Sequence, residues 1–221
     1  MSEILTVGDD HRAGTIARAA AALGRGELVV VPTDTVYGLA ADAFSPRATA
    51  RVFATKERSR RYPLPVLVHG PKQLLGLADE VPPAAERLMA RYWPGPLTLV
   101  LRAQDGVAWD IGENEGTVAV RMPFDDVCLE IIRAVGPLAC TSANRSGQPP
   151  ATTAAEARAA LGDGVALYVD AGPRTGHAPS TIVDLTRSEP FLARDGDLPA
   201  DEVMAVARGD DDATPDAERA S

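Results

Sequence analysis

The 221-residue sequence has few cysteines and no long apolar run. Cys128 and Cys140 are too few for a disulfide framework or a cysteine-built metal site, and their apolar surroundings predict buried, inert thiols. No apolar stretch approaches the roughly 20 residues that span a bilayer. The N-terminal segment MSEILTVGDDHR has acidic residues where a signal peptide is basic and then apolar. These absences predict a cytoplasmic protein without a membrane segment.

The signatures of the best-known catalytic sites are also missing. The sequence has no G-x-x-x-x-G-K-[S/T] phosphate loop, no G-x-G-x-x-G after a strand, no H-E-x-x-H and no G-x-S-x-G. The three histidines, His11, His69 and His177, lie far apart in the sequence, which disfavours a histidine-built metal site or triad. Any nucleotide site must therefore be built differently from the common ones.

Charge is unevenly distributed along the chain. The formal net charge is −9, which argues against general affinity for nucleic acid. The segment 47–61 nevertheless holds six basic residues and one acidic residue, a net +5. Such a segment is either a solvated charged loop or an anion site, and composition alone favours the loop.

Apolar runs and helix signals alternate along the chain, which predicts an α/β layer architecture. The predicted strands are 28–31, 63–68, 97–101, 117–121, 137–141, 165–169, 181–185 and 191–194, and the predicted helices are 15–23, 46–55, 83–91, 124–135, 154–161 and 199–207. The last two strands are too close in sequence for a crossover, so the sheet should be mixed. We expect one domain over 1–208. The segment 209–221 has five acidic residues and one arginine, which predicts a disordered tail.

Polar clusters lie at the ends of five predicted strands. They comprise Thr33-Asp34-Thr35, Lys56-Glu57-Arg58, Arg121, the turn Thr141-Ser142-Ala143-Asn144 and Ser180-Thr181. Taken singly, each is also explained by an ordinary turn, a helix end or a salt bridge. Because the ends of strands can meet in space, the set favours one shared cleft lined by hydroxyl groups and cations and largely without acids.

The lysine and arginines of the basic segment suggest what such a cleft binds. Lys56 ends a predicted helix, where a cation complements the helix dipole, but this does not explain why Arg58, Arg60 and Arg61 continue into the loop. Arginine offers a planar fork of donors and lysine a point charge. Together they suit a polyphosphate tail.

Six motifs in order identify a family. VVVPTDTVYGLAADAF, KER followed by PLPVLV, WPGPLTLVL, TVAVRMP, TSANRSGQPPATTA and STIVDLT make the chain resemble the YrdC-type threonylcarbamoyl-AMP synthases over about residues 15–207. The resemblance implies a twisted mixed sheet flanked by helices around a large concave basic cavity. It also implies conversion of L-threonine, bicarbonate and ATP into threonylcarbamoyl-adenylate and pyrophosphate, for threonylcarbamoyladenosine modification of tRNA.

The resemblance also implies roles for individual residues. The catalytic pair would be Lys56 and Arg58, facing the ATP phosphates; ATP would also contact Thr117, Ser142, Asn144 and Arg194; L-threonine would contact Thr35, Arg121, Thr141 and Ser180. No carboxylate cluster predicts a metal cage, so Mg²⁺ is expected to arrive with ATP. The chain departs from the family pattern at Ser59, Tyr62 and Leu67, where proline, asparagine and histidine are frequent.

Two other functions fit parts of the sequence. An RNA-binding module would use the basic segment, but the net charge of −9 and the lack of aromatic platforms count against it, so direct tRNA binding should be weak or absent. A related carbamoyl-adenylate-forming enzyme would share the scaffold, although such proteins usually carry further domains. If the chain makes threonylcarbamoyl-adenylate, its expected partners are downstream tRNA threonylcarbamoyl-transfer proteins.

Overall fold

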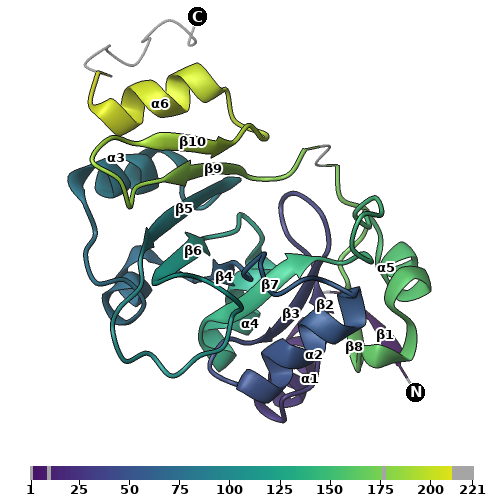
Figure 1. The fold of residues 1–221 in the computed structure, drawn as a ribbon. Helices are drawn as coiled ribbons and strands as arrows, with labels where there is room; N and C mark the ends of the chain where they lie inside the picture. The colour runs from purple at the N-terminus through teal and green to yellow at the C-terminus, as the bar shows by residue number, and fades with distance from the viewer. Residues whose placement is uncertain (1, 9–10, 176–177, 211–221) are drawn as a thin grey trace, which may run out of the picture.

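A ten-stranded sheet organises the chain in a computed structural model that describes residues 2–8, 11–175 and 178–210 (Figure 1). Its strands are β1 (Glu3–Thr6), β2 (Val29–Val31), β3 (Gly38–Asp42), β4 (Val66–Leu67), β5 (Leu97–Arg102), β6 (Thr117–Arg121), β7 (Leu138–Ser142), β8 (Leu167–Asp170), β9 (Thr181–Asp184) and β10 (Phe191–Arg194). They lie in the order β1-β8-β2-β3-β7-β4-β6-β5-β9-β10. Strands β1, β2, β4 and β5 have a parallel neighbour, whereas β3 is antiparallel to both of its neighbours. The predicted mixed α/β architecture is confirmed.

Helices cover both faces of the sheet. They are α1 (Arg12–Gly24), α2 (Pro46–Lys56), α3 (Pro83–Tyr92), α4 (Asp126–Val135), α5 (Ala154–Leu161) and α6 (Ala200–Arg208), with short 3₁₀ turns at Pro71–Gly76 and Gly162–Gly164. Strand β2 shows how two faces arise, because Val29 and Val31 pack in the core with α1 and α4 while Val30 packs in the core with α2 and α5. Alternate side chains of a strand point to opposite faces, so an all-apolar strand is buried on both.

The predicted elements are found within a few residues of their expected bounds, with three exceptions. The predicted strand 63–68 shrinks to β4, because Pro63 and Pro65 have no backbone N–H to donate to a ladder. Strand β3 was not predicted, since Gly-Leu-Ala-Ala-Asp has low β propensity and reads as part of a loop. The short N-terminal β1, parallel to β8, was also missed.

The C-terminal helix ends where the sequence changes composition. Helix α6 stops at Arg208, and Gly209 follows in a left-handed conformation (φ 82°, ψ 21°) that closes its last turn. From residue 211 the predicted tail lies outside the described residues. Within the described ranges, no helix combines the length and the apolar composition that crossing a bilayer requires.

Candidate functional site

A cavity of about 190 Å³ brings most of the predicted site residues together. Seven of the ten line it: Thr35, Arg58, Arg121, Thr141, Ser142, Ser180 and Arg194. Among the described residues that line the cavity, every charged side chain is an arginine. Pockets for drug-sized ligands usually measure about 300–1,000 Å³, so this cavity suits an amino acid, and a nucleotide must extend beyond it.

Strand topology explains why the cavity spans the sheet instead of lying along one edge. Leu67 of β4 pairs with Arg121 of the parallel strand β6 and with Leu138 of the antiparallel strand β7. Arg121 ends β6 and Ser142 ends β7, so these two residues lie toward opposite ends of the sheet. The site therefore extends across the strands from Arg121 to Ser142. The cavity gathers seven of the ten predicted site residues, whereas Lys56, Thr117 and Asn144 lie outside it.

Two of the three cavity arginines have no carboxylate partner among the described residues. Arg58 donates from Nε to the carbonyl oxygen of Tyr62 (2.9 Å) and from Nη2 to that of Pro63 (3.3 Å). Arg194 donates to the carbonyl oxygen and the Oγ of Ser180, both at 2.9 Å. Burial, followed by the charges of Arg121 and Arg58, lowers the pKa of Arg194. Arg58 is half-buried and Arg194 lies at the exposed end of β10, and two converging cations without a carboxylate partner favour an anion at this site.

The third arginine, Arg121, is paired. Its side chain is 8% exposed and forms an ion pair with Asp34, 11% exposed. Its Nε also donates to the carbonyl oxygen of Gly95 (3.0 Å) and its Nη1 to Thr35 Oγ1 (3.3 Å). Arg58 and Arg194 therefore carry a charge that no carboxylate of the described residues balances. Arg121 is neutralised by Asp34, and its partners hold its side chain in place.

A chain of hydroxyl groups extends from Arg194 into strand β5. Ser180 Oγ accepts from Arg194 Nη2 and lies 2.8 Å from Thr98 Oγ1, and both hydroxyl groups are buried. Sequence reasoning missed Thr98, whose only signal is a hydroxyl residue inside the apolar strand LTLVL. Thr33, which the sequence placed in a polar cluster without a specific role, also lines the cavity, and its Oγ1 lies 3.1 Å from Thr35 Oγ1.

The cavity also has an apolar side. Leu67 and Cys140 line it and are nearly inaccessible, and burial raises the pKa of Cys140 to about 12, so its thiol stays protonated. Tyr62, another departure from the family pattern, is 66% exposed, and the guanidinium of Arg58 lies 5.8 Å from its ring centroid. The predicted inert thiols are confirmed as buried, although Cys140 also faces the cavity.

A left-handed residue separates the two basic side chains of the Lys-Glu-Arg motif. Glu57 follows α2 with φ 54° and ψ 40°. This turn directs Lys56 into the protein, where it is 2% exposed, and leaves Arg58 to line the cavity. The left-handed turn at Glu57 therefore places Lys56 in the protein interior and Arg58 at the cavity.

The side chain of Lys56 anchors the turn Thr141-Ser142-Ala143-Asn144 through hydrogen bonds. Its Nζ donates to the carbonyl oxygen of Ser142, to that of Asn144 (2.6 Å) and to Asn144 Oδ1 (3.0 Å). An ammonium has three donors, so all of them are used within the protein. Asn144 Nδ2 in turn donates to the carbonyl oxygen of Gln148. Neither Lys56 nor Asn144 lines the enclosed cavity in this structure, and their predicted contacts with ATP stay predictions.

Thr117 also lies outside the enclosed cavity. It begins β6, four residues from Arg121, and its Oγ1 donates to the carbonyl oxygen of Asn114 (2.7 Å). Because β6 and β7 run in opposite directions on either side of β4, Thr117 lies toward the end of the sheet that carries Ser142. Its predicted role on the nucleotide side stays a prediction, and this placement is compatible with it.

The backbone at Glu57 yields a stability prediction. A left-handed conformation costs a non-glycine residue roughly 1–2 kcal/mol, and the exposed ion pair between Glu57 and Arg145 contributes about 0–1 kcal/mol. Glu57→Gly should therefore raise the free energy of unfolding by about 0.5–1 kcal/mol in urea titrations. Glu57→Val should lower it, and Arg145→Ala reports the ion pair alone. A glycine variant less stable than Arg145→Ala would contradict this account.

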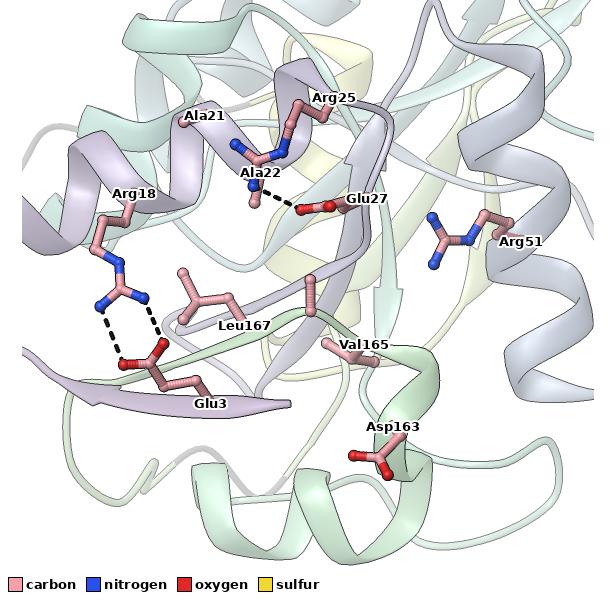
Figure 2. A pocket seen from close by; sticks show the side chains of 11 residues that line it. Glu3, Arg18, Ala21, Ala22, Arg25, Glu27, Arg51, Asp163, Val165 and Leu167 are labelled. Atoms are coloured by element: carbon pink, nitrogen blue, oxygen red, sulfur yellow. Dashed lines mark hydrogen bonds and ion pairs between the residues drawn. The ribbon is translucent and has the colours of Figure 1, made fainter. Parts of the chain in front are cut away.

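A larger cavity of about 500 Å³ lies between α1, α2 and β8, but its charges are largely satisfied locally. Figure 2 shows Arg18 facing Glu3 and Arg25 facing Glu27, each within hydrogen-bond distance. Arg51 donates there to the carbonyl oxygen of Gly26 (3.1 Å). The formal charges of the three arginines and three acidic residues that line this larger cavity sum to zero. It therefore lacks the excess of positive charge found around Arg58 and Arg194.

The described part of the chain contains no group of three or more His, Cys, Asp or Glu side chains placed to hold a metal ion. The cavity near Arg58 offers hydroxyl and carbonyl oxygens but no carboxylate among its described lining residues. Hydroxyl and carbonyl oxygens can complete the coordination of an ion whose other ligands are phosphate oxygens and water.

Comparison with known proteins places the chain in a family. The family model for the Sua5, YciO and YrdC proteins, described as "Telomere recombination", matches residues 21–196. The chain belongs to this family. It is 44% identical over 207 residues to a "Putative threonylcarbamoyl-AMP synthase" of Mycobacterium tuberculosis, covering 93% of this chain and 95% of the relative. It is 39% identical to the "Threonylcarbamoyl-AMP synthase" of Pyrococcus abyssi, covering 93% of this chain and 61% of that protein.

Solved structures of this family agree with the fold. The crystal structure of P. abyssi Sua5 complexed with L-threonine superposes with a TM-score of 0.88 at 38% identity, covering 93% of this chain and 61% of that one. Escherichia coli YciO gives a TM-score of 0.79 at 24% identity, covering 89% of this chain and 96% of that chain. This chain therefore spans about three fifths of the length of the archaeal protein.

Proposed function

We propose that this protein synthesises L-threonylcarbamoyladenylate from L-threonine, bicarbonate and ATP and releases pyrophosphate. The observation that carries the proposal is the cavity, where two uncompensated arginines, one fixed arginine and a set of hydroxyl groups converge. This combination suits a polyphosphate beside a small amino acid. Relatives bearing the name threonylcarbamoyl-AMP synthase, one of them 95% covered by this chain, support it.

The reaction requires alignment more than a covalent nucleophile. The amine of threonine takes up bicarbonate, with loss of water, to give an N-carboxylate. One oxygen of that carboxylate attacks the α-phosphorus of ATP, and the bond to the β-phosphate oxygen breaks to release pyrophosphate. Both reactants are anionic, so charge repulsion and misalignment are the main obstacles.

Residues in and beside the cavity are placed to offset the charge repulsion and to align the two reactants. Arg58 and Arg194 are proposed to offset the charge of the phosphates, and Mg²⁺ delivered with ATP adds to this. On the nucleotide side we place Thr117, Ser142 and Asn144, with Lys56 beneath the turn. On the threonine side we place Arg121 with the hydroxyl groups of Thr35, Thr141 and Ser180, and the apolar wall of Leu67 and Cys140 near the methyl group.

The product is a mixed anhydride, which is reactive toward water. We propose that it passes to tRNA threonylcarbamoyl-transfer proteins in the cytoplasm. The net charge of −9 supports a route through protein partners with weak or no direct binding of tRNA.

Pyrophosphate release from ATP tests the proposed function. Release should require both L-threonine and bicarbonate, and the other product should have the mass of threonylcarbamoyladenylate. Release that persists without threonine would contradict the proposal and leave a general adenylating enzyme. Release supported by carbamoyl phosphate in place of threonine and bicarbonate would indicate the related carbamoyl-adenylate activity. A tRNA gel shift at moderate salt without pyrophosphate release would indicate an RNA-binding module.

A further inference from the structure

The carboxylate of Asp34 lies behind the cavity, against the guanidinium of Arg121. Asp34 belongs to the loop between β2 and β3 and does not line the cavity, whereas its neighbours Thr33 and Thr35 do. Its Oδ1 accepts from Arg121 Nη2. Substrate would therefore meet Arg121 and not Asp34, and any effect of Asp34 on substrate must pass through Arg121.

Two N–H donors of Arg121 have no partner among the described residues and can form a fork toward a ligand. A guanidinium has five N–H groups, and three are used by Gly95, Thr35 and Asp34. One N–H remains on each of the two terminal nitrogens. Two parallel N–H groups are the arrangement that binds a carboxylate through both of its oxygens. The three protein acceptors fix the plane of this fork, and Asp34 is the only charged one among them in the described structure.

Asp34 itself is not fully satisfied. Its second oxygen, Oδ2, is buried and has no hydrogen-bond partner among the described residues. A buried acceptor without a partner destabilises the folded state, and native proteins retain few of them. A carboxylate kept only for stability would be expected to use both oxygens. The unsatisfied oxygen points to a functional reason for keeping the charge at this position.

Asp34 accounts for a difference in charge between the three arginines of the cavity. Arg58 and Arg194 contact carbonyl and hydroxyl oxygens only and keep their full charge, whereas Arg121 is neutralised by Asp34. A triphosphate is drawn to full charge, and a single carboxylate can be bound by an oriented fork. We propose that Asp34 is a positioning residue that orients the free N–H pair of Arg121 and reserves it for the carboxylate of the amino-acid substrate. This inference rests on the proposed function.

Asp34→Asn tests the inference, because it keeps the shape and one acceptor oxygen but removes the charge. The KM for L-threonine should rise by on the order of 10-fold, since a charge-assisted hydrogen bond is roughly twice as strong as a neutral one. The KM for ATP should change less than about threefold, because that substrate is assigned to Arg58 and Arg194. A threonine KM that is unchanged or lower in a folded variant would overturn the inference.

Asp125→Asn is a matched control. Asp125 is also 11% exposed and pairs with Arg174, which is 16% exposed, but it does not line the cavity. It should affect thermal stability in a similar way to Asp34→Asn and leave the threonine KM within about threefold of the wild-type value. An equal rise in threonine KM in both variants would show a general loss of packing and overturn the inference.

A double-mutant cycle with Arg121→Lys tests whether Asp34 acts through Arg121. If it does, adding Asp34→Asn to Arg121→Lys should raise the threonine KM by less than about threefold further. Full additivity would overturn the inference. If Asp34→Asn does not fold, Asp34→Glu serves instead, because it moves the charge by one methylene and should also raise the threonine KM. A folded glutamate variant with an unchanged threonine KM would count against the role.

These outcomes are separable from a failure of the proposed function. A wild-type protein that releases no pyrophosphate with threonine and bicarbonate contradicts the proposed function itself. A wild-type protein that does so, together with an Asp34→Asn variant of unchanged threonine KM, contradicts only the role of Asp34.

Discussion

Replacing Arg58 with alanine should lower kcat/KM for ATP by on the order of 10²-fold, the effect of removing one preorganised group that stabilises developing charge. Arg58 lines the cavity, and its protein partners are the carbonyl oxygens of Tyr62 and Pro63. Burial lowers the pKa of Arg58. Because Arg58 has no ion pair among the described residues and its protein acceptors are backbone carbonyls, the variant should unfold at close to the wild-type urea midpoint.

Two further variants separate charge from shape and from position. Arg58→Lys keeps the positive charge but loses the planar fork, so its kcat/KM should fall between those of the wild type and the alanine variant. Arg61→Ala removes an exposed charge from the same basic segment and should leave the rate nearly unchanged. An Arg58→Ala variant within threefold of the wild type would remove Arg58 from the site.

The basic segment shows how far sequence can separate a solvated loop from a site. Composition alone favoured a solvated loop, and the structure divides the segment. Arg58 enters the cavity, whereas Arg60 pairs with Asp110 and Arg61 is exposed. That division depends on the left-handed turn at Glu57, a residue type that carries little signal for such a turn. The motif could be found from the sequence, but the direction of each side chain could not.

The strands show a similar limit. Apolar runs located most of the sheet, because a strand buried on both faces has a clear pattern. They could not reveal β3, and β3 is antiparallel to both β2 and β7. Without it, the order of the strands could not be predicted, and neither could the path of the shared cleft across them. The sheet order puts Arg121 and Ser142 toward opposite ends, and the cavity crosses the strands between them.

Thr98, Asp34 and Cys140 show why the roles of some site residues are hard to predict from the sequence. Each is buried beside the cavity or within its wall, and each has an ordinary structural explanation in sequence. Their importance arises from what they contact, namely Ser180, Arg121 and the enclosed space. Contacts between residues far apart in the chain are the information that motif reasoning does not contain.

Lys56→Met should lower the rate of pyrophosphate release by on the order of 10²-fold, because the turn that carries Ser142 and Asn144 would lose the cation that positions it. Unlike Arg58, Lys56 also supports the fold, because its Nζ holds three oxygens of Ser142 and Asn144. Those oxygens lose their partner in the variant, which should reduce the free energy of unfolding by about 1–3 kcal/mol. Lys72→Met, at an exposed position, should change neither quantity. A Lys56→Met variant with near-wild-type rate would contradict the assignment.

The pH dependence of activity separates the charge of Lys56 from its packing. Burial, followed by the nearby charge of Arg58, lowers the pKa of Lys56 from 10.5 to about 8. The ammonium therefore holds the turn below pH 8, and activity should fall as the pH rises through about 8 and Nζ loses a donor. Lys56→Arg stays charged in this range, so its residual activity should lack this decline.

Unfolding does not account for that decline, because the linkage has the opposite sign. Between pH 8 and 10.5 the unfolded chain keeps the proton on Lys56 while the folded chain has released it. The unfolded state binds more protons there, so the contribution of Lys56 to the free energy of unfolding rises with pH. We therefore expect an unchanged circular dichroism signal at pH 8–9 while the rate declines. A rate and a fold that are lost together would assign the decline to another group.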